Sequence, residues 1–281
     1  MTTGPGGSSS GNGRSIATAT AIGAGRTGYD VIDVERYLDR IGHRGPIAPE
    51  IETLRQIHRA HLMTVPFENL SVRRGEAIVL EESRLFEKIV LRRRGGFCYE
   101  LNGLFAALLG TLGFRVARLA GRVGADGIPF DHMALRVDLD EPWLADVGFG
   151  DSFLLPLRLE GREPQQGGCG RRYRLDAADG GLLLLREEPE GWQRQYLFTL
   201  ETWPLSAFED GCHHHRTSSE SPFTRKTVVS RATETGRITL SERLLIVTSS
   251  GMRTETVLGD DAAISRVLAE QFGIEDQRVG D

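Results

Sequence analysis

Residues 94–113 read RGGFCYELNGLFAALLGTLG, and this stretch organises the rest of the chain. Two glycines form a tight turn, after which apolar residues recur at helical spacing in a broad stripe: Leu101, Leu104, Phe105, Leu108, Leu109 and Leu112. Gly113 follows the last of them, at the position where glycine commonly ends a helix. The pattern predicts a helix over residues 98–112 that begins directly at a cysteine.

The place of Cys98 in the first turn of that helix favours a chemical role. Free backbone N–H groups and the positive end of the helix dipole stabilise a thiolate there, and a nearby imidazolium would stabilise it further. The thiolate is the form that acts as a nucleophile. A cysteine at a helix start can equally be a small buried apolar residue, so the assignment of Cys98 as a nucleophile depends on its partners.

Two later segments supply a candidate histidine and a candidate acid. His132 lies early in the β-like segment DHMALRVDL (131–139), and Asp146 lies in the apolar segment WLADVGFG (143–150). A carboxylate among apolar residues is costly unless it is paired. His132 is the economical partner, and Asp146 would hold its ring as the third member of a Cys-His-Asp triad.

The short connection Asp-Glu-Pro (140–142) indicates that these two segments form an antiparallel hairpin. Because side chains alternate between the two faces of a strand, His132 and Asp146 share a face only if paired residue numbers add to an even value near 278 or 280. We therefore predict such a register, for example Val137 opposite Glu141, or a bulge with the same effect. An odd register without a bulge would exclude the pair.

Composition and periodicity change along the rest of the chain. Residues 1–28 are rich in Gly, Ser and Thr, and they predict a disordered leader. Helical spacing predicts three helices before the cysteine, at about 34–41, 49–65 and 81–93. Short β-like segments then follow as a meander or small barrel, and a polar connection from Ser206 leads to three further β-like segments and a helix near 260–272.

Composition narrows the classes of function. The 281 residues, 40% hydrophobic and 26% charged, suit a folded globular protein with one large domain or two to three small ones. A net charge of −5 without a Lys/Arg-rich block argues against a nucleic-acid partner. Since no stretch approaches the ~20 apolar residues of a membrane helix, we expect no membrane partner. Three widely spaced cysteines favour a cytoplasmic location over export.

Four sequence blocks, in this order, resemble the arylamine N-acetyltransferases: VPFENL (65–70), RGGFCYELN (94–102), HMAL (132–135) and DVGFG (146–150). The resemblance extends from about Tyr29 to the C-terminus, and the first two blocks are specific when taken together. It implies an α+β multidomain fold with a Cys-His-Asp, cysteine-protease-like active site. Its parts would be a helical bundle over 29–113, a β-barrel over 114–205 and an α/β lid over 206–281.

The resemblance also implies roles for single residues. Cys98, His132 and Asp146 fall on the three catalytic positions of the family. Five further positions would line the cleft for substrate and coenzyme A, although core packing is the ordinary role of such side chains: Phe67, Phe97, Phe149, Gly150 and Phe223. We expect Arg94 to pair with Glu68 and Asn69 in a structural role.

The implied reaction has acetyl-CoA as acyl donor and arylamines, hydrazines or arylhydroxylamines as acceptors, in a ping-pong mechanism through an acetyl thioester on Cys98. One position departs from the family. Asp131 stands before His132, where a small or neutral polar residue is usual, and its carboxylate could favour the charged form of His132 or weaken coenzyme binding.

Three other interpretations stay open on the sequence. Some family members form an amide bond with a carrier-bound acyl chain in place of acetyl-CoA. A cysteine hydrolase or transglutaminase-like enzyme would share the Cys-His-Asp order and release a free acid. The run CHHH (212–215) could belong to a metal-binding module, but adjacent histidines cannot all point at one ion, so we expect a solvated loop there and no metal.

Overall fold

The computed structural model describes Met1, residues 32–124 and residues 126–275. The leader expected over 1–28 lies, apart from Met1, outside the described residues. Among the residues that are described, no helix combines the length and the apolar character needed to span a membrane.

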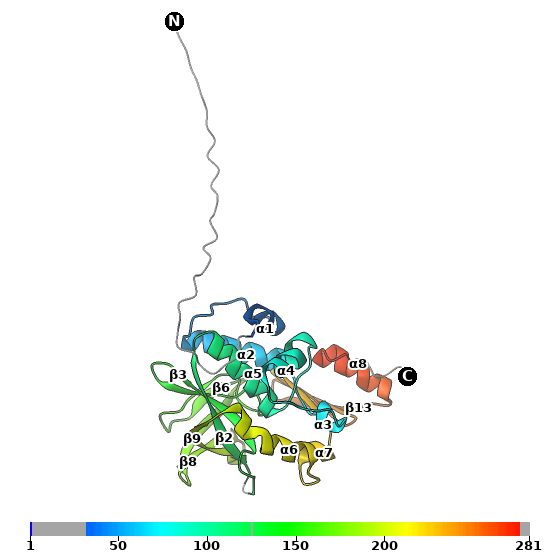
Figure 1. Ribbon diagram of the computed structural model, residues 1–281. Helices are drawn as coiled ribbons and strands as arrows, with labels where there is room; N and C mark the ends of the chain where they lie inside the picture. Colours follow the sequence, from blue (N-terminus) through cyan, green and yellow to red (C-terminus); the bar gives the residue numbers. More distant parts are fainter. Residues whose placement is uncertain (2–31, 125, 276–281) are drawn as a thin grey trace.

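The apolar stripe of residues 98–112 forms the helix α5 (Cys98–Thr111), as predicted, and Gly113 follows it with a φ of +91°. Leu101, Leu104 and Leu108 are fully buried. Burial of each such leucine contributes about 1.5–3 kcal/mol, so α5 is central to the core between the helices and the larger sheet (Figure 1). The elements that precede α5 are α1 (Val34–Ile41), α2 (Ile51–Thr64), β1 (Phe67–Glu68), α3 (Leu70–Arg73), α4 (Glu82–Phe86) and the π-helix η1 (Glu87–Leu91).

The third predicted helix, over 81–93, was wrong as a single regular helix, because α4 passes directly into η1. A π-helix has a wider turn than the 3.6-residue period assumed in the prediction. Within η1, Ile89 is fully buried and Lys88 Nζ lies 2.6 Å from the Oε1 atom of Glu100 in α5.

Eight antiparallel strands form a barrel-like sheet in the order β5-β4-β3-β2-β9-β8-β7-β6. Its two edge strands nearly meet: the Gln165 amide donates to the carbonyl of Arg158 at 3.0 Å and accepts from its N–H at 2.7 Å. The strands are β2 (Arg115–Val123), β3 (His132–Asp138), β4 (Pro142–Ala145), β5 (Leu157–Arg158), β6 (Gln165–Gly168), β7 (Arg171–Ala178), β8 (Gly181–Glu188) and β9 (Gly191–Trp203).

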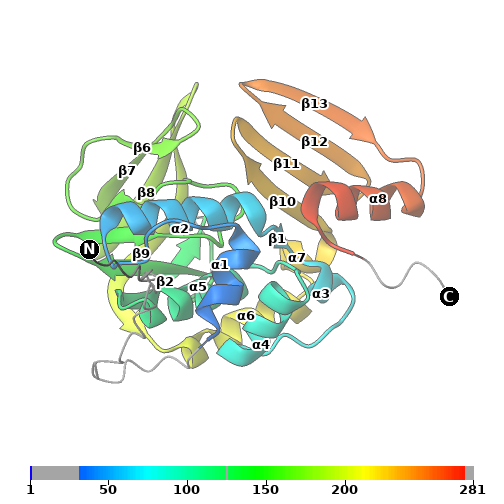
Figure 2. The same ribbon diagram turned by 90° about the horizontal axis from the view of Figure 1, so that it is seen from above.

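A second sheet, with the order β1-β10-β11-β12-β13, joins the helical region to the C-terminal region, since β1 pairs with β10. Helix α8 packs against β10, and α2 reaches the same strand (Figure 2). The edge strand β13 was not predicted, because its residues are exposed and lack an apolar face. The elements are β10 (Val228–Thr233), β11 (Gly236–Ser241), β12 (Leu244–Ser249), β13 (Met252–Val257) and α8 (Asp261–Phe272).

The polar connection after Ser206 is helical, which corrects the prediction of a solvated loop for CHHH (212–215). It contains η2 (Leu205–Phe208), α6 (Glu209–Thr217) and α7 (Pro222–Arg225). Cys212 and His215 are one helical turn apart in α6, and both are buried. The acidic first turn and basic last turn of α6, which suit the helix dipole, were a signal available in the sequence.

Candidate active site

Cys98 is the first residue of α5, held at the end of the turn Arg94–Phe97. Phe97, the residue before the helix, has an extended backbone, and its N–H donates to the Glu100 carboxylate at 3.2 Å. The opposite wall is Gly148, where an added Cβ would lie 2.7 Å from the Cα of Cys98. Only a residue without a side chain fits there, so the loop carrying Asp146 comes into contact with the start of α5.

His132 and Asp146 form a buried pair, with 2.7 Å between Nε2 and Oδ2. The predicted even register is confirmed, because Val137 pairs with Trp143 and the paired numbers in β3 and β4 add to 280. Both side chains therefore lie on one face of the hairpin. Met133, the residue after His132, contacts Cys98 through its backbone, which brings the cysteine, the histidine and the aspartate together.

Asp146 stands just beyond β4 and not inside a strand that continues to Gly150 as predicted. Its N–H donates to Nε2 of His58 at 3.0 Å, and its Oδ1 accepts the N–H of Gly148 at 2.9 Å. These bonds take the place of strand pairing, as Asp side chains often do at turns.

The Asp146 carboxylate accepts four hydrogen bonds, including those from Asn102 at 2.8 Å and from the Tyr196 hydroxyl at 2.9 Å. Burial by itself raises the pKa of Asp146, but the His132 charge and hydrogen bond, followed by Asn102 and Gly148, outweigh burial and hold the pKa below its usual value. Asp146 is therefore kept as a fully buried carboxylate.

The Cys98 thiol differs from expectation in its electrostatics. Burial raises its pKa well above the usual value, the hydrogen bond with the Met133 backbone lowers it, and the charge of Asp146 raises it further. The helix start alone therefore does not leave Cys98 ionised at neutral pH. Ionisation of the sulfur requires a nearby group that takes the proton.

Three residues that sequence analysis missed support the site. Asn102 lies one turn after Cys98, and it donates to the Met133 carbonyl at 2.6 Å as well as to Asp146. That spacing within α5 was an available signal. His58 donates through Nδ1 to the Leu154 carbonyl at 2.9 Å and accepts the Asp146 N–H. For His58 in α2 and Tyr196 in β9, no local sequence pattern indicated a role.

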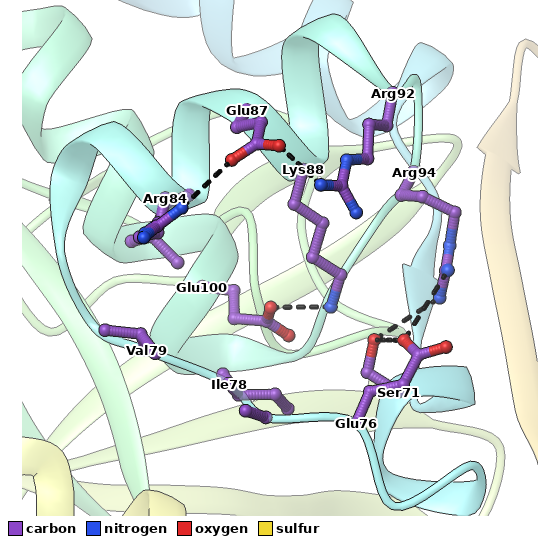
Figure 3. A pocket seen from close by; sticks show the side chains of 12 residues that line it. Ser71, Glu76, Ile78, Val79, Arg84, Glu87, Lys88, Arg92, Arg94 and Glu100 are labelled. Carbon is purple, nitrogen blue, oxygen red and sulfur yellow. Dashed lines mark hydrogen bonds and ion pairs between the residues drawn. The ribbon is translucent and has the colours of Figure 1, made fainter.

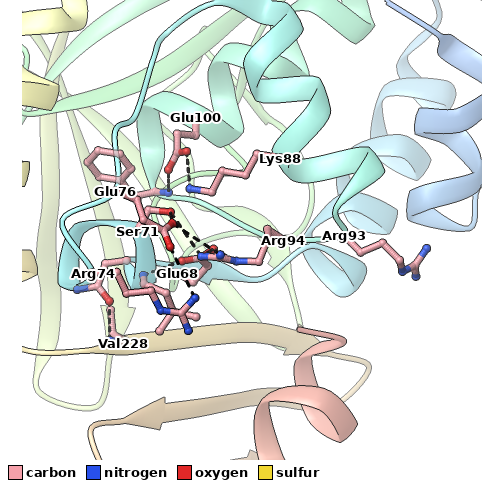
Figure 4. Close-up of polar contacts among 12 residues, drawn as sticks. Glu68, Ser71, Arg74, Glu76, Lys88, Arg93, Arg94, Glu100 and Val228 are labelled. Atoms are coloured by element: carbon pink, nitrogen blue, oxygen red, sulfur yellow. Dashed lines mark hydrogen bonds and ion pairs between the residues drawn. The ribbon is translucent and has the colours of Figure 1, made fainter. Parts of the chain in front are cut away.

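Arg94 pairs with Glu68, as expected, with 2.8 Å between the guanidinium and Oε1 (Figure 4). The expected pairing of Arg94 with Asn69 is wrong, because the Asn69 side chain has other partners among the described residues. The Asn69 amide donates to the carbonyls of Phe223 and Lys226, at 2.9 and 2.7 Å, and accepts the Val228 N–H. Glu68 and Asn69 therefore fasten the turn and the C-terminal region separately.

The predicted cleft residues lie in different surroundings. Phe97, Phe67 and Phe223 belong to the apolar cluster that contains Cys98, whereas Phe149 packs against a neighbouring cluster. Phe149 packs edge-on against the His132 ring at 5.2 Å between centroids. Phe67 lies in contact range of Gly150 and 5.9 Å from Phe223, and all three are partly exposed. Phe97 is fully buried, so its ring supports the site from behind and has no surface open to a substrate.

Asp131 belongs to a second histidine–aspartate pair, with 2.8 Å between its Oδ1 and Nε2 of His215 in α6. Its other oxygen accepts the Val123 N–H at 3.0 Å. The His215 ring packs against Phe223, with 5.1 Å between centroids. The unusual carboxylate before His132 is thus engaged by the C-terminal region.

The other side of the Arg94 turn borders a cavity of about 440 Å³, lined by Lys88, Glu100 and Arg94 among others (Figure 3). The catalytic candidates Cys98, His132 and Asp146 are not among its lining residues. Figure 3 shows its cations facing carboxylates, such as Lys88 against Glu100. The described residues hold no group of three or more His, Cys, Asp or Glu arranged for a metal ion.

Comparisons with known proteins agree with the four sequence blocks. A family model described as N-acetyltransferase matches residues 50–279. The chain is 35% identical to an arylamine N-acetyltransferase of Mycobacterium tuberculosis, over 89% of this chain and 92% of that protein. It is 31% identical to the proansamycin X synthase of Amycolatopsis mediterranei, over 87% of this chain and all of that protein.

The fold also matches a solved structure of the Mycobacterium marinum arylamine N-acetyltransferase in complex with CoA. The TM-score is 0.83 at 35% identity, and the match covers 89% of this chain and 95% of that one.

Proposed function

Because the chain belongs to the arylamine N-acetyltransferase family of enzymes, we propose that it transfers an acetyl group from acetyl-CoA to arylamines, hydrazines or arylhydroxylamines. The observation that carries the proposal is the 2.7 Å bond between His132 and Asp146 beside Cys98 at the start of α5. The CoA complex of the Mycobacterium marinum relative supports coenzyme A as the carrier of the acetyl group.

The first half-reaction begins with a proton shift. Nε2 of His132 is bonded to Asp146, which leaves Nδ1 as the nitrogen for the Cys98 proton. The high pKa of the buried thiol means that the thiolate forms together with the His132 imidazolium, whose charge Asp146 balances.

The thiolate then attacks the carbonyl carbon of acetyl-CoA. Backbone N–H groups near the start of α5 stabilise the oxyanion, and the bond between the acetyl group and the coenzyme sulfur breaks. The imidazolium returns its proton to the departing CoA thiolate. Cys98 is left as an acetyl thioester.

In the second half-reaction an amine nitrogen attacks that thioester. His132 takes the amine proton, the carbon–sulfur bond to Cys98 breaks, and the acetamide leaves. Water competes with the amine for the thioester, so we assign to the C-terminal region, 206–281, the role of a lid that restricts its access. Phe149 and Phe223, both partly exposed, would form walls for the acceptor ring.

A second candidate function is amide synthesis with a different acyl donor. It rests on the similarity to the proansamycin X synthase, which covers all of that protein. The same three residues would form the thioester, so the two functions differ in the donor and not in the chemistry of Cys98.

Intact-protein mass spectrometry tests the proposal directly. The protein is mixed with acetyl-CoA in the absence of amine, and then with aniline or a hydrazide. We expect one added acetyl group that disappears when the amine is added. Cys98→Ala should carry no acetyl group, whereas the matched control Cys212→Ala, which changes another buried cysteine, should still be acetylated.

Two results would contradict the proposal. Acetylation of Cys98→Ala would show that Cys98 is not the nucleophile. A protein that stays unmodified under conditions that exclude fast hydrolysis would point to another acyl donor. Release of the acetyl group as acetate, with no effect of added amine, would favour a cysteine hydrolase.

A further inference from the structure

Three arginines, two from the barrel-like sheet and one from the C-terminal sheet, converge on Asp151. Arg171 of β7 and Arg237 of β11 both bind Oδ1, Arg237 at 2.9 Å. Arg186 of β8 lies 3.3 Å from Oδ2 and donates to the Asp151 carbonyl at 3.1 Å. A single carboxylate therefore joins arginines from both sheets.

Among the described residues, two carboxylates form ion pairs with these three arginines, namely Asp151 and Glu188. Glu188 lies 2.5 Å from Arg186. Arg171 and Arg237 therefore share Asp151 as their carboxylate partner. The Arg237 side chain is only 11% exposed, and burial lowers its pKa in spite of the nearby Asp151. A buried cation with a shared counter-ion is costly and favours binding of a further anion.

A cavity of about 180 Å³ opens beside these arginines, and Arg171, Arg237 and Ser152 line it. Its volume exceeds several-fold the roughly 30 Å³ that one water molecule occupies in the liquid. Ser152 is 8% exposed, and its Oγ has no hydrogen-bond partner among the described residues. The cavity thus combines an excess of positive charge with an unused buried hydroxyl group.

We propose that this cavity binds a phosphate-type oxyanion through Arg171, Arg237 and Ser152. Guanidinium groups present paired donors that match the oxygens of a tetrahedral anion, and hydrogen bonds between ionised groups are stronger than neutral ones. The anion supplies the negative charge that Asp151 alone does not, and it accepts the hydrogen bond of Ser152.

The oxyanion could be inorganic phosphate or a phosphate group of the coenzyme. Ser152 follows Asp146 by six residues, so the two lie within roughly 22 Å of each other. The extended pantetheine and diphosphate arm of coenzyme A covers a distance of that order. The anion site does not depend on the proposed function; only its assignment to the coenzyme rests on that function.

Isothermal titration with inorganic phosphate tests the site itself. We expect the intact protein to bind phosphate and Arg237→Gln to bind it at least about tenfold more weakly. Ser152→Ala, which keeps every charge, should lose less affinity for phosphate than Arg237→Gln. The matched control is Arg172→Gln, because Arg172 is the neighbour of Arg171 in β7 and pairs with Glu187 at the exposed surface.

Absence of phosphate binding to the unaltered protein in the millimolar range overturns the proposal. So does unchanged affinity in folded Arg237→Gln. If Arg237→Gln fails to fold, Arg171→Gln takes its place, with folding checked by circular dichroism, and unchanged affinity there has the same meaning.

Kinetics with two donors distinguish the sources of the anion. If the coenzyme supplies it, Arg237→Gln raises KM for acetyl-CoA but not for S-acetylpantetheine, which lacks the diphosphate. If KM for both donors is unchanged while phosphate binding is weakened, the site takes free phosphate. An unaltered protein that uses neither donor contradicts the proposed function, whereas the titration alone decides the anion site.

Discussion

Two histidine–aspartate pairs meet at the start of β3, and they share their geometry and burial but differ in the groups around them. The bond is 2.7 Å in His132–Asp146 and 2.8 Å in His215–Asp131, and all four side chains are at most 10% exposed. Asp146 accepts four hydrogen bonds, and Met133, the residue after its histidine, contacts Cys98 through its backbone. His215 instead contacts Ser221 and joins α6 to β3.

The comparison teaches that a buried histidine–aspartate bond is no sign of catalysis by itself. Both aspartates have a pKa below the usual value, because hydrogen bonds and charges outweigh the effect of burial in each. What separates the pairs is the surroundings of each histidine: Met133, the residue after His132, contacts the Cys98 thiol through its backbone, whereas Nδ1 of His215 lies 3.1 Å from the Ser221 hydroxyl. We assign the first pair to proton transfer and the second to positioning of the C-terminal region.

Replacement of each histidine in turn should give the largest difference in activity between the two pairs. His132→Gln removes the proposed proton acceptor of Cys98, and we expect kcat/KM to fall by about 10⁴-fold. His215→Gln keeps a hydrogen-bonding side chain between Asp131 and Ser221, and its activity should stay within about fivefold. Steady-state acetylation of an arylamine measures both. Similar losses of activity in the two variants would contradict the different roles assigned to the two pairs.

Neutral replacement of the aspartates should have the next largest effect. Asp146→Asn leaves His132 without a charged partner and disturbs four hydrogen bonds, so we expect a fall in kcat of about 10³-fold. Asp131→Asn should change kcat little and lower the free energy of unfolding by about 1–2 kcal/mol. Urea denaturation and kinetics on the same preparations check this. A loss of kcat in Asp131→Asn as large as in Asp146→Asn would contradict the assigned roles.

The histidine behind Asp146 provides a test through pH. Burial lowers the pKa of His58 to about 4, against about 6.5 in an unfolded chain. Above pH 6.5 His58 is neutral in both states. As the pH falls from about 6.5 to about 4, the unfolded chain takes up a proton that the folded protein does not, so stability decreases. The neutral His58 thus contributes about 3 kcal/mol to the free energy of unfolding at neutral pH, and this is lost as the pH falls to about 4.

Urea unfolding of the unaltered protein and of His58→Asn at pH 7 and pH 4.5 measures that contribution. The variant should be less stable at pH 7 but lose less stability on acidification. Equal losses in the two proteins would show that His58 is not held neutral behind Asp146.

The smallest expected effects come from the tyrosines that contact the two pairs. Tyr196→Phe removes the hydroxyl that donates to Asp146, and we expect kcat to fall about tenfold. Tyr99→Phe removes a bond to the Phe130 carbonyl at 2.7 Å, beside Asp131, and should affect stability more than kcat. Thermal unfolding and kinetics separate the two results; the reverse order would exchange the roles of the pairs.

Much of the fold follows from short-range patterns in the sequence. The apolar stripe after Cys98 defines α5, because helix periodicity and a terminal glycine depend on residues a few positions apart. The even register of β3 and β4 follows from the requirement that His132 and Asp146 share a face. The family resemblance of the four blocks likewise needed no coordinates.

Only the tertiary structure decided which distant groups serve the site. His58, Tyr196 and His215 reach Asp146 and Asp131 from elements that are far away in the chain. The same holds for the arginines around Asp151, which come from two sheets. Periodicity and capping act within one or two turns, whereas these contacts arise when separate elements pack together, and packing fixes the hydrogen bonds, burial and charge around each group.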